Sequence, residues 1–179
     1  MEARGPVRTR WRGPEAVSDL RSLVDTNVLV YRIDPRDPPK REVATDLLRR
    51  GFAKRSIALP HQAILEFVAT STRFRSGGPD AGRPLLPRDE ALRQAEELMW
   101  LAPVLYPNSQ VVRTALRGVA VYGLSWFDAH LWAYAEVFGI PEILSEDFEH
   151  GRRYGTVRVV DPFHELAEGE VHEPRESYG

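Results

Sequence analysis

The stretch LVDTNVLV, residues 23–30, decides the fold, because it changes from an apolar strand to a helix within a few residues. Its first two residues are apolar and lead into the polar cluster Asp25, Thr26 and Asn27. The apolar residues that follow predict a helix over residues 27–33. A short, fully apolar strand that leads directly into a helix is typical of a parallel sheet covered on both faces.

The same alternation continues along the chain. Four further short apolar runs predict strands over residues 56–59, 102–106, 142–145 and 157–160. Apolar residues at helical spacing predict helices over residues 41–54, 61–75, 87–100, 108–122 and 125–138. Five strands alternating with helices predict an α/β fold with a parallel sheet. In such sheets, functional sites gather at the carboxyl ends of the strands.

The composition restricts the class of protein. A chain of 179 residues fits one domain of roughly 100–200 residues, and 42% hydrophobic residues are enough for a core. The absence of cysteine excludes a disulfide framework, a cysteine-ligated zinc site and thiol catalysis. No apolar run reaches the ~18–20 residues that span a bilayer, and the N-terminus lacks the apolar segment of a secretory signal. We therefore expect a soluble, cytoplasmic protein without a membrane span.

Charge is unevenly distributed, although the net charge is only -2. Residues 1–21 carry five arginines against three acids, whereas residues 164–179 carry five glutamates against one arginine. The intervening residues 22–163 are balanced. We expect a single domain over 22–163, preceded by a flexible extension and followed by an acidic tail. This distribution excludes a uniformly basic coat for nucleic acid but not nucleic-acid binding itself.

Two aspartates stand at the carboxyl ends of predicted strands. Asp25 ends the first strand between apolar runs, where a carboxylate costs roughly several kcal/mol of desolvation unless it is paired or binds a cation. Asp147 follows the fourth strand, within ILSEDFEHG, residues 143–151. Each also has a purely structural interpretation. Asp25 could be only the N-cap of the next helix, and Asp147 only a capping or turn residue.

Two further carboxylates lie on predicted helices with few polar neighbours. Glu66 is the only polar residue among residues 63–69, although it could emerge on a solvated stripe. Asp128 shares an apolar stripe with Leu131 and Ala135, and its place near a helix N-terminus is the alternative explanation. Gathered at one sheet edge, the four acids would raise one another's pKa values unless a divalent cation neutralised them. Oxygen ligands alone favour Mg²⁺ or Mn²⁺.

In this order the motifs resemble those of the PIN-domain ribonucleases, and within them the VapC-type toxins of type II toxin–antitoxin pairs. The resemblance runs from about residue 23 to residue 163 and rests on three stretches: LVDTNVLVY (23–31), SWFDAHLWAYA (125–135) and ILSEDFEHG (143–151). It implies an α/β/α sandwich with a five-stranded parallel sheet, and Mg²⁺- or Mn²⁺-dependent endonucleolytic hydrolysis of RNA. It also implies an inhibiting antitoxin protein as partner, and commonly a homodimer.

The resemblance also implies roles for individual residues. Asp25, Glu66, Asp128 and Asp147 match the four acids of the family, which hold the metal and its activated water. Asp25 and Asp128 are expected to bind the metal directly, the other two directly or through water. Three polar residues match positions that support the acids by hydrogen bonding: Thr26, Asn27 and Ser145. Four arginines near the acidic segments could bind RNA phosphates, or be ordinary surface residues: Arg73, Arg75, Arg152 and Arg153.

Two other functions stay compatible with the sequence. One is a non-catalytic PIN-fold module that binds RNA or serves as a scaffold, and the other is a housekeeping nuclease without a toxin role. The presence of all four acids favours an enzyme over the binding module.

Overall fold

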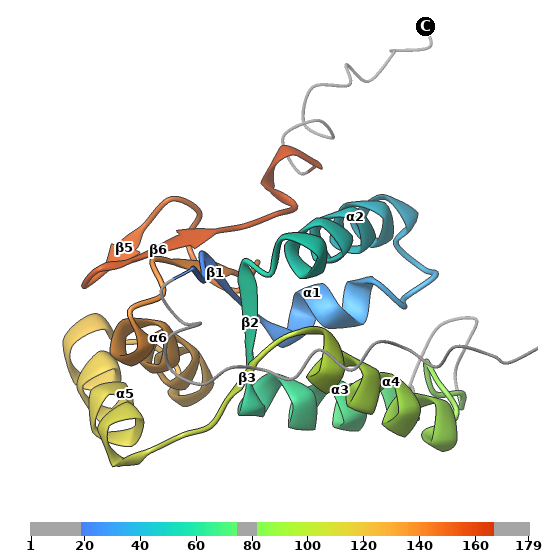
Figure 1. Cartoon of the computed structure of the whole chain (residues 1–179), viewed down its shortest axis with the longest axis horizontal. Coiled ribbons are helices and arrows are strands. Elements are labelled where there is room, and N and C mark those ends of the chain that lie inside the picture. Colours follow the sequence, from blue (N-terminus) through green and yellow to red (C-terminus); the bar gives the residue numbers. More distant parts are fainter. Residues whose placement is uncertain (1–18, 75–81, 167–179) are drawn as a thin grey trace, which may run out of the picture.

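The computed structural model describes residues 19–74 and 82–166, which form a six-stranded sheet with helices on both faces (Figure 1). The strand order is β3-β2-β1-β4-β6-β5. Five strands are parallel: β1 (Ser22–Val24), β2 (Ile57–Pro60), β3 (Val104–Leu105), β4 (Glu142–Leu144) and β6 (Val157–Val160). The sixth, β5 (Arg153–Tyr154), is antiparallel to β6 at the edge.

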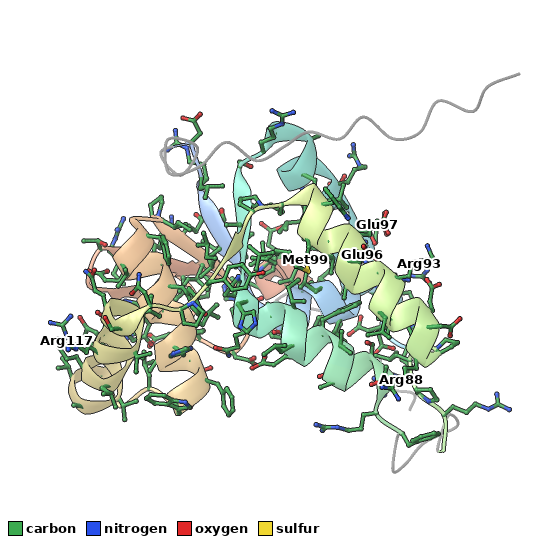
Figure 2. The ribbon with its side chains drawn as sticks, turned by 60° about the horizontal axis from the view of Figure 1, so that its bottom comes forward. Arg88, Arg93, Glu96, Glu97, Met99 and Arg117 are labelled. Atoms are coloured by element: carbon green, nitrogen blue, oxygen red, sulfur yellow. The ribbon has the colours of Figure 1, made fainter. Side chains whose placement is uncertain are left out.

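The helices divide into two groups on opposite faces of the sheet (Figure 1). One group contains α1 (Thr26–Tyr31), α2 (Pro38–Lys54), α3 (His61–Thr72) and α4 (Arg88–Leu101). The other contains α5 (Ser109–Tyr122) and α6 (Trp126–Phe138). Figure 2 shows that the charged side chains of α4 project from its outer surface, among them Arg88, Arg93, Glu96 and Glu97.

The alternating direction of side chains along the strands supplies both faces with apolar residues. In β1, Leu23 packs in the core beneath α5 and α6, whereas Val24 packs in the core beneath α1–α4. In β4, Ile143 and Leu144 divide between the two cores in the same way. All four side chains are at most 6% exposed, which explains why these strands read as continuous apolar runs.

The five parallel strands predicted from the sequence are confirmed, and so is the α/β/α sandwich. The third strand is shorter than predicted, because only Val104 and Leu105 pair with β2. The antiparallel strand β5 was not predicted. It is only two residues long, which is too short for a periodic pattern. A turn in which Gly155 has a φ of 59° joins it to β6.

Packing extends slightly past the predicted domain limits of 22–163. Leu20 is 4% exposed and belongs to the core beneath α5 and α6, while Leu166 packs against the other core. Most of the predicted extension and tail lies outside the described residues, and so does Arg75. Across residues 19–74 and 82–166, no helix has the length and apolar character needed to cross a membrane.

Candidate active site

Asp25 is placed at the carboxyl end of the central strand β1, where the chain turns into α1. It is the N-cap of α1, and its Oδ1 accepts a hydrogen bond from the Thr26 amide at 2.6 Å. The side chain is nevertheless buried, since the residue is only 8% exposed. Burial raises the pKa of Asp25 to about 7, although the hydrogen bonds from Ser145 and Thr26 oppose the rise. The capping interpretation is therefore correct but incomplete, because a surface cap would not be desolvated.

Asn27 and Ser145 join the ends of the neighbouring strands β1 and β4. The Ser145 hydroxyl donates to Asp25 Oδ2 at 2.6 Å and accepts from the Asp147 amide at 3.1 Å. Asn27 Nδ2 lies 3.2 Å from Ser145 Oγ, 3.2 Å from Asp147 Oδ2 and 3.3 Å from Asp25 Oδ2. One amide group thus lies between two carboxylates that would otherwise repel each other.

Glu66, on α3, is held by two hydrogen bonds, one to each carboxylate oxygen. Thr26 Oγ1 donates to Oε2 at 2.8 Å, and Gln62 Nε2 donates to Oε1 at 2.8 Å. Gln62 lies one helical turn before Glu66, which places both side chains on the same side of α3. The sequence interpretation did not assign Gln62 to the site, although this i, i+4 spacing was visible.

Asp128 lies in the first turn of α6, which Ser125 caps. The Asp128 amide donates to Ser125 Oγ at 3.2 Å, and the Ser125 hydroxyl donates to Asp128 Oδ2 at 2.7 Å. The apolar stripe predicted for this helix is real at Leu131 and Ala135, which are 2% and 0% exposed. Asp128 forms the half-buried end of that stripe.

Asp147 couples electrostatically to the acids on both helices. Burial raises its pKa, the hydrogen bond from Asn27 lowers it, and the charges of Glu146, Asp128 and Glu66 raise it further. The charges of Asp147 and Glu66 likewise raise the pKa of Asp25. All four predicted acids therefore belong to one set of interacting charges, which we call the acidic cluster: Asp25, Glu66, Asp128 and Asp147.

The chemistry of the acidic cluster fits a hard cation. Its four carboxylates supply only oxygen ligands, and the raised pKa of Asp25 reflects buried charge that a cation would compensate. Asn27 Oδ1 and Gln62 Oε1, both beside the cluster, are buried oxygens without a hydrogen-bond partner. However, no three acidic or histidine side chains of the described residues form a ready-made metal site. The residues nevertheless fit such an ion by the chemistry of their donor atoms.

The arginines predicted to bind RNA phosphates are less closely tied to the cluster. Arg73 caps the C-terminus of α3 and is exposed. Arg152 pairs with Glu149 at 2.9 Å and lies 4.8 Å from the centre of the Tyr154 ring, while Arg153 belongs to β5. Within the described part of the chain, no hydrogen bond or ion pair joins these three arginines to the four acids.

Comparison with known proteins identifies this architecture. The family model of the PIN domain matches residues 22–155, which include all seven predicted acidic and supporting residues. A search of curated proteins returned no match to the chain.

Solved structures share the fold at low sequence identity. A chain of the DNA-bound VapBC structure from Salmonella typhimurium is 14% identical, with a TM-score of 0.55; the match covers 80% of this chain and 98% of that one. VapBC-1 from nontypeable Haemophilus influenzae is 15% identical, with a TM-score of 0.52 and coverage of 80% and 98%. VapC20 from Mycobacterium tuberculosis, a toxin that cleaves the sarcin–ricin loop, is 16% identical, with a TM-score of 0.50 and coverage of 68% and 86%.

Proposed function

The chain belongs to the PIN domain family, and from that premise we propose that it is a metal-dependent endoribonuclease, the toxin of a toxin–antitoxin pair. The observation that carries the proposal is the coupling of four acids from separate segments into one cluster. The fold shared with VapBC and VapC20 chains supports the toxin role, since VapC20 is itself a toxin that cleaves the sarcin–ricin loop.

The acidic cluster would hold Mg²⁺ or Mn²⁺, with Asp25 and Asp128 as direct ligands and Glu66 and Asp147 binding directly or through water. When bound, such an ion lowers the pKa of water and offsets the negative charge that develops on phosphate oxygens. Arg73 and Arg153 are exposed and could bind phosphates of the RNA backbone, as could Arg75 and Arg152.

The supporting residues keep the acids in place before RNA arrives. Thr26 and Gln62 hold the two oxygens of Glu66, so its carboxylate cannot rotate freely. Ser145 fixes Asp25 by donating a hydrogen bond to its Oδ2. Such hydrogen bonds to prospective ligands orient them and reduce the reorganisation needed on metal binding.

The proposed toxin would bind a cognate antitoxin and form a homodimer. Exposed apolar side chains outside the cluster offer surface on which a protein partner could pack. Eight such side chains of the described residues are at least half exposed, among them Leu92 on α4 (50%), Leu116 on α5 (56%) and Phe127 on α6 (63%).

A non-catalytic PIN-fold module is the second candidate. The observation in its favour is that no three acidic or histidine side chains of the described residues form a group that could hold a metal ion. A housekeeping nuclease would share the chemistry of the toxin but not its partner. A small antitoxin gene adjacent to this one would favour the toxin over the housekeeping enzyme.

Purified protein incubated with RNA tests the proposal. We expect cleavage with Mg²⁺ or Mn²⁺, no cleavage with a chelator, and a loss of about 100-fold or more in Asp25→Asn and Asp128→Asn, because each removes a charged ligand without changing side-chain size. Asp46→Asn is the matched control, since Asp46 is a partly exposed acid on α2 that pairs with Arg49 and Arg50. Equal cleavage by all variants would show that another nuclease is responsible.

Expression in a bacterial host tests the toxin role. Growth arrest and new RNA 5′ ends are expected with the wild type and not with Asp25→Asn. Co-expression of the adjacent gene should restore growth. Cleavage in vitro without growth arrest would favour the housekeeping nuclease.

A further inference from the structure

A second polar cluster lies next to the acidic one and is not used by the proposed chemistry. Its centre is Lys40, near the N-terminus of α2. Lys40 Nζ donates to Glu146 Oε2 at 2.5 Å and to the Tyr31 hydroxyl at 3.0 Å. The same nitrogen lies 4.4 Å from the centre of the Tyr31 ring and 5.3 Å from that of Phe163. Tyr31 and Phe163 in turn meet edge to face at 5.0 Å.

The contact between Lys40 and Glu146 is a long-range connection. It joins α2 to the segment after β4, across 106 residues of sequence. The two side chains are only 25% and 22% exposed, so water screens the pair less than it would a surface pair. Removing one partner from such a pair leaves the other charge poorly solvated.

Glu146 lies between two residues of the candidate site. Ser145 contacts Asp25 and Asp147 contacts Asn27, so both neighbours of Glu146 face the acidic cluster. Glu146 itself turns the other way, toward Lys40. The ion pair therefore anchors the middle of a three-residue segment whose two ends support the site.

The ion pair between Lys40 and Glu146 also compensates the negative charge of Glu146. Glu146 is close enough for its charge to act on Asp147, and without Lys40 no ion pair would compensate that charge. A freed carboxylate could also compete with the four acids for a cation. The side chains that face Lys40 from neighbouring elements are Tyr31 from α1, Phe163 from the C-terminal segment and Glu146.

We propose that Lys40 is a positioning residue of the acidic cluster: its ion pair with Glu146 fixes the segment 145–147, keeping Ser145 and Asp147 in place and Glu146 out of the cluster. Its effect on RNA cleavage rests on the proposed function. Its effect on the segment and on cation binding does not require RNA cleavage.

Three variants and one control test this role. Lys40→Met removes the positive charge of the ion pair, Glu146→Ala removes its negative partner on the segment 145–147, and Lys40→Arg keeps the positive charge. Lys54→Met is the matched control, because Lys54 is an exposed lysine at the other end of the same helix. Glu146→Ala leaves only the hydratable ammonium group of Lys40, so it keeps the test open if Lys40→Met does not fold.

Binding of Mn²⁺, measured by calorimetry on folded protein, is the first readout. We expect Lys40→Met and Glu146→Ala each to weaken binding by about 10-fold, as changes behind metal ligands commonly do. The double variant should be no weaker than either single variant, because both break the same contact. Lys40→Arg should stay within about 3-fold of the wild type, and Lys54→Met should match it. Unchanged or tighter binding in folded Lys40→Met and Glu146→Ala would overturn the proposal.

Hydrogen exchange of the metal-free protein is the second readout. Amides of residues 146–148 should exchange faster in Lys40→Met and Glu146→Ala, whereas those of α6 should not change. Equal acceleration throughout the protein would mean that Lys40 only stabilises the fold, and would also overturn the proposal. In cleavage assays kcat should fall more than KM rises. If the wild type binds Mn²⁺ but cuts no RNA, the proposed function fails while binding and exchange still decide this inference.

Discussion

Asp25 shows how one residue serves both the fold and the site. Its Oδ1 caps α1, and its Oδ2 accepts from Ser145 across the sheet edge. These contacts stabilise the carboxylate, but they do not offset burial and the charges of Asp147 and Glu66. Without a cation, the residue is therefore held in a place that favours its protonated form.

This balance predicts how the stability of the metal-free protein depends on pH. Burial raises the pKa of Asp25 from 3.8 to about 7, so between these values the folded protein keeps a proton that the unfolded chain releases. The free energy of unfolding should therefore fall as pH rises from about 4 to about 7, by on the order of 4 kcal/mol for this group. In Asp25→Asn this contribution should be absent, since an amide caps the helix without titrating.

Urea denaturation in the presence of a chelator, at several pH values between 4 and 8, measures the free energy of unfolding of the wild type and of Asp25→Asn. Subtracting the Asp25→Asn curve from the wild-type curve removes the contribution of the other acids. Asp46→Asn serves as the control, because the Asp46 side chain is 41% exposed. A wild-type curve parallel to that of Asp25→Asn would contradict the assigned burial of Asp25.

At the scale of elements, the close pairing of α5 with α6 depends on Gly118. A methyl group at this position would lie 2.7 Å from Trp132 Cε3 and 2.8 Å from Cζ3. Trp132 cannot easily move away, because its ring is 5% exposed and its Nε1 donates to the Tyr154 carbonyl at 2.9 Å. Glycine thus lets α5 approach the tryptophan that links α6 to β5.

We predict that Gly118→Ala destabilises the protein despite the higher helix propensity of alanine. The overlap with Trp132 should cost about 1–3 kcal/mol, which exceeds the gain of roughly 1 kcal/mol from replacing glycine in a helix. Urea denaturation gives the free energy directly. Arg113→Ala, at an exposed position of the same helix, should change it by less than about 0.5 kcal/mol. A Gly118→Ala protein as stable as the wild type would show that the helices can separate without cost.

The sequence predicted the elements better than the contacts between them. Residues 23–24 and 143–144 are apolar because both faces of their strands are covered, so these strands were recognisable in the sequence. The strand β5 was not, because its two residues are held by pairing with β6. For the same reason the pair of Lys40 and Glu146 escaped prediction, since 106 residues separate its members and no local pattern joins them.

At the scale of the whole molecule, the four acids come from the ends of β1 and β4 and from the helices α3 and α6. The sequence indicated that they could converge, because two of them follow strands whose carboxyl ends meet at one edge of a parallel sheet, and the other two are carboxylates on apolar helices. The i, i+4 spacing places Gln62 beside Glu66, but the sequence does not show whether that side of α3 is solvated, because exposure depends on the packing of α3 against the rest of the domain.

A cation bound to this edge would connect the cluster to the stability of the entire domain. An ion that binds only the folded state stabilises it by about 2.7 kcal/mol at one hundred times its Kd. Binding must displace the proton from Asp25, whose pKa is about 7, so apparent affinity should fall by up to roughly tenfold for each pH unit below that value. The increase in Tm caused by Mn²⁺ should therefore be large at pH 8 and small at pH 6.

Thermal unfolding with and without Mn²⁺ at these two pH values checks the prediction, with a chelator to reverse the shift. The stabilisation by Mn²⁺ should thus increase as pH rises, whereas the stability of the metal-free protein should decrease. The two trends are opposite because the cation binds the deprotonated acids, and without a cation the fold disfavours their deprotonation. Asp25→Asn should show a small shift at both pH values, since it lacks both the charge and the titration, whereas Asp46→Asn should behave as the wild type. Equal shifts in Asp25→Asn and wild type would place the cation elsewhere on the molecule.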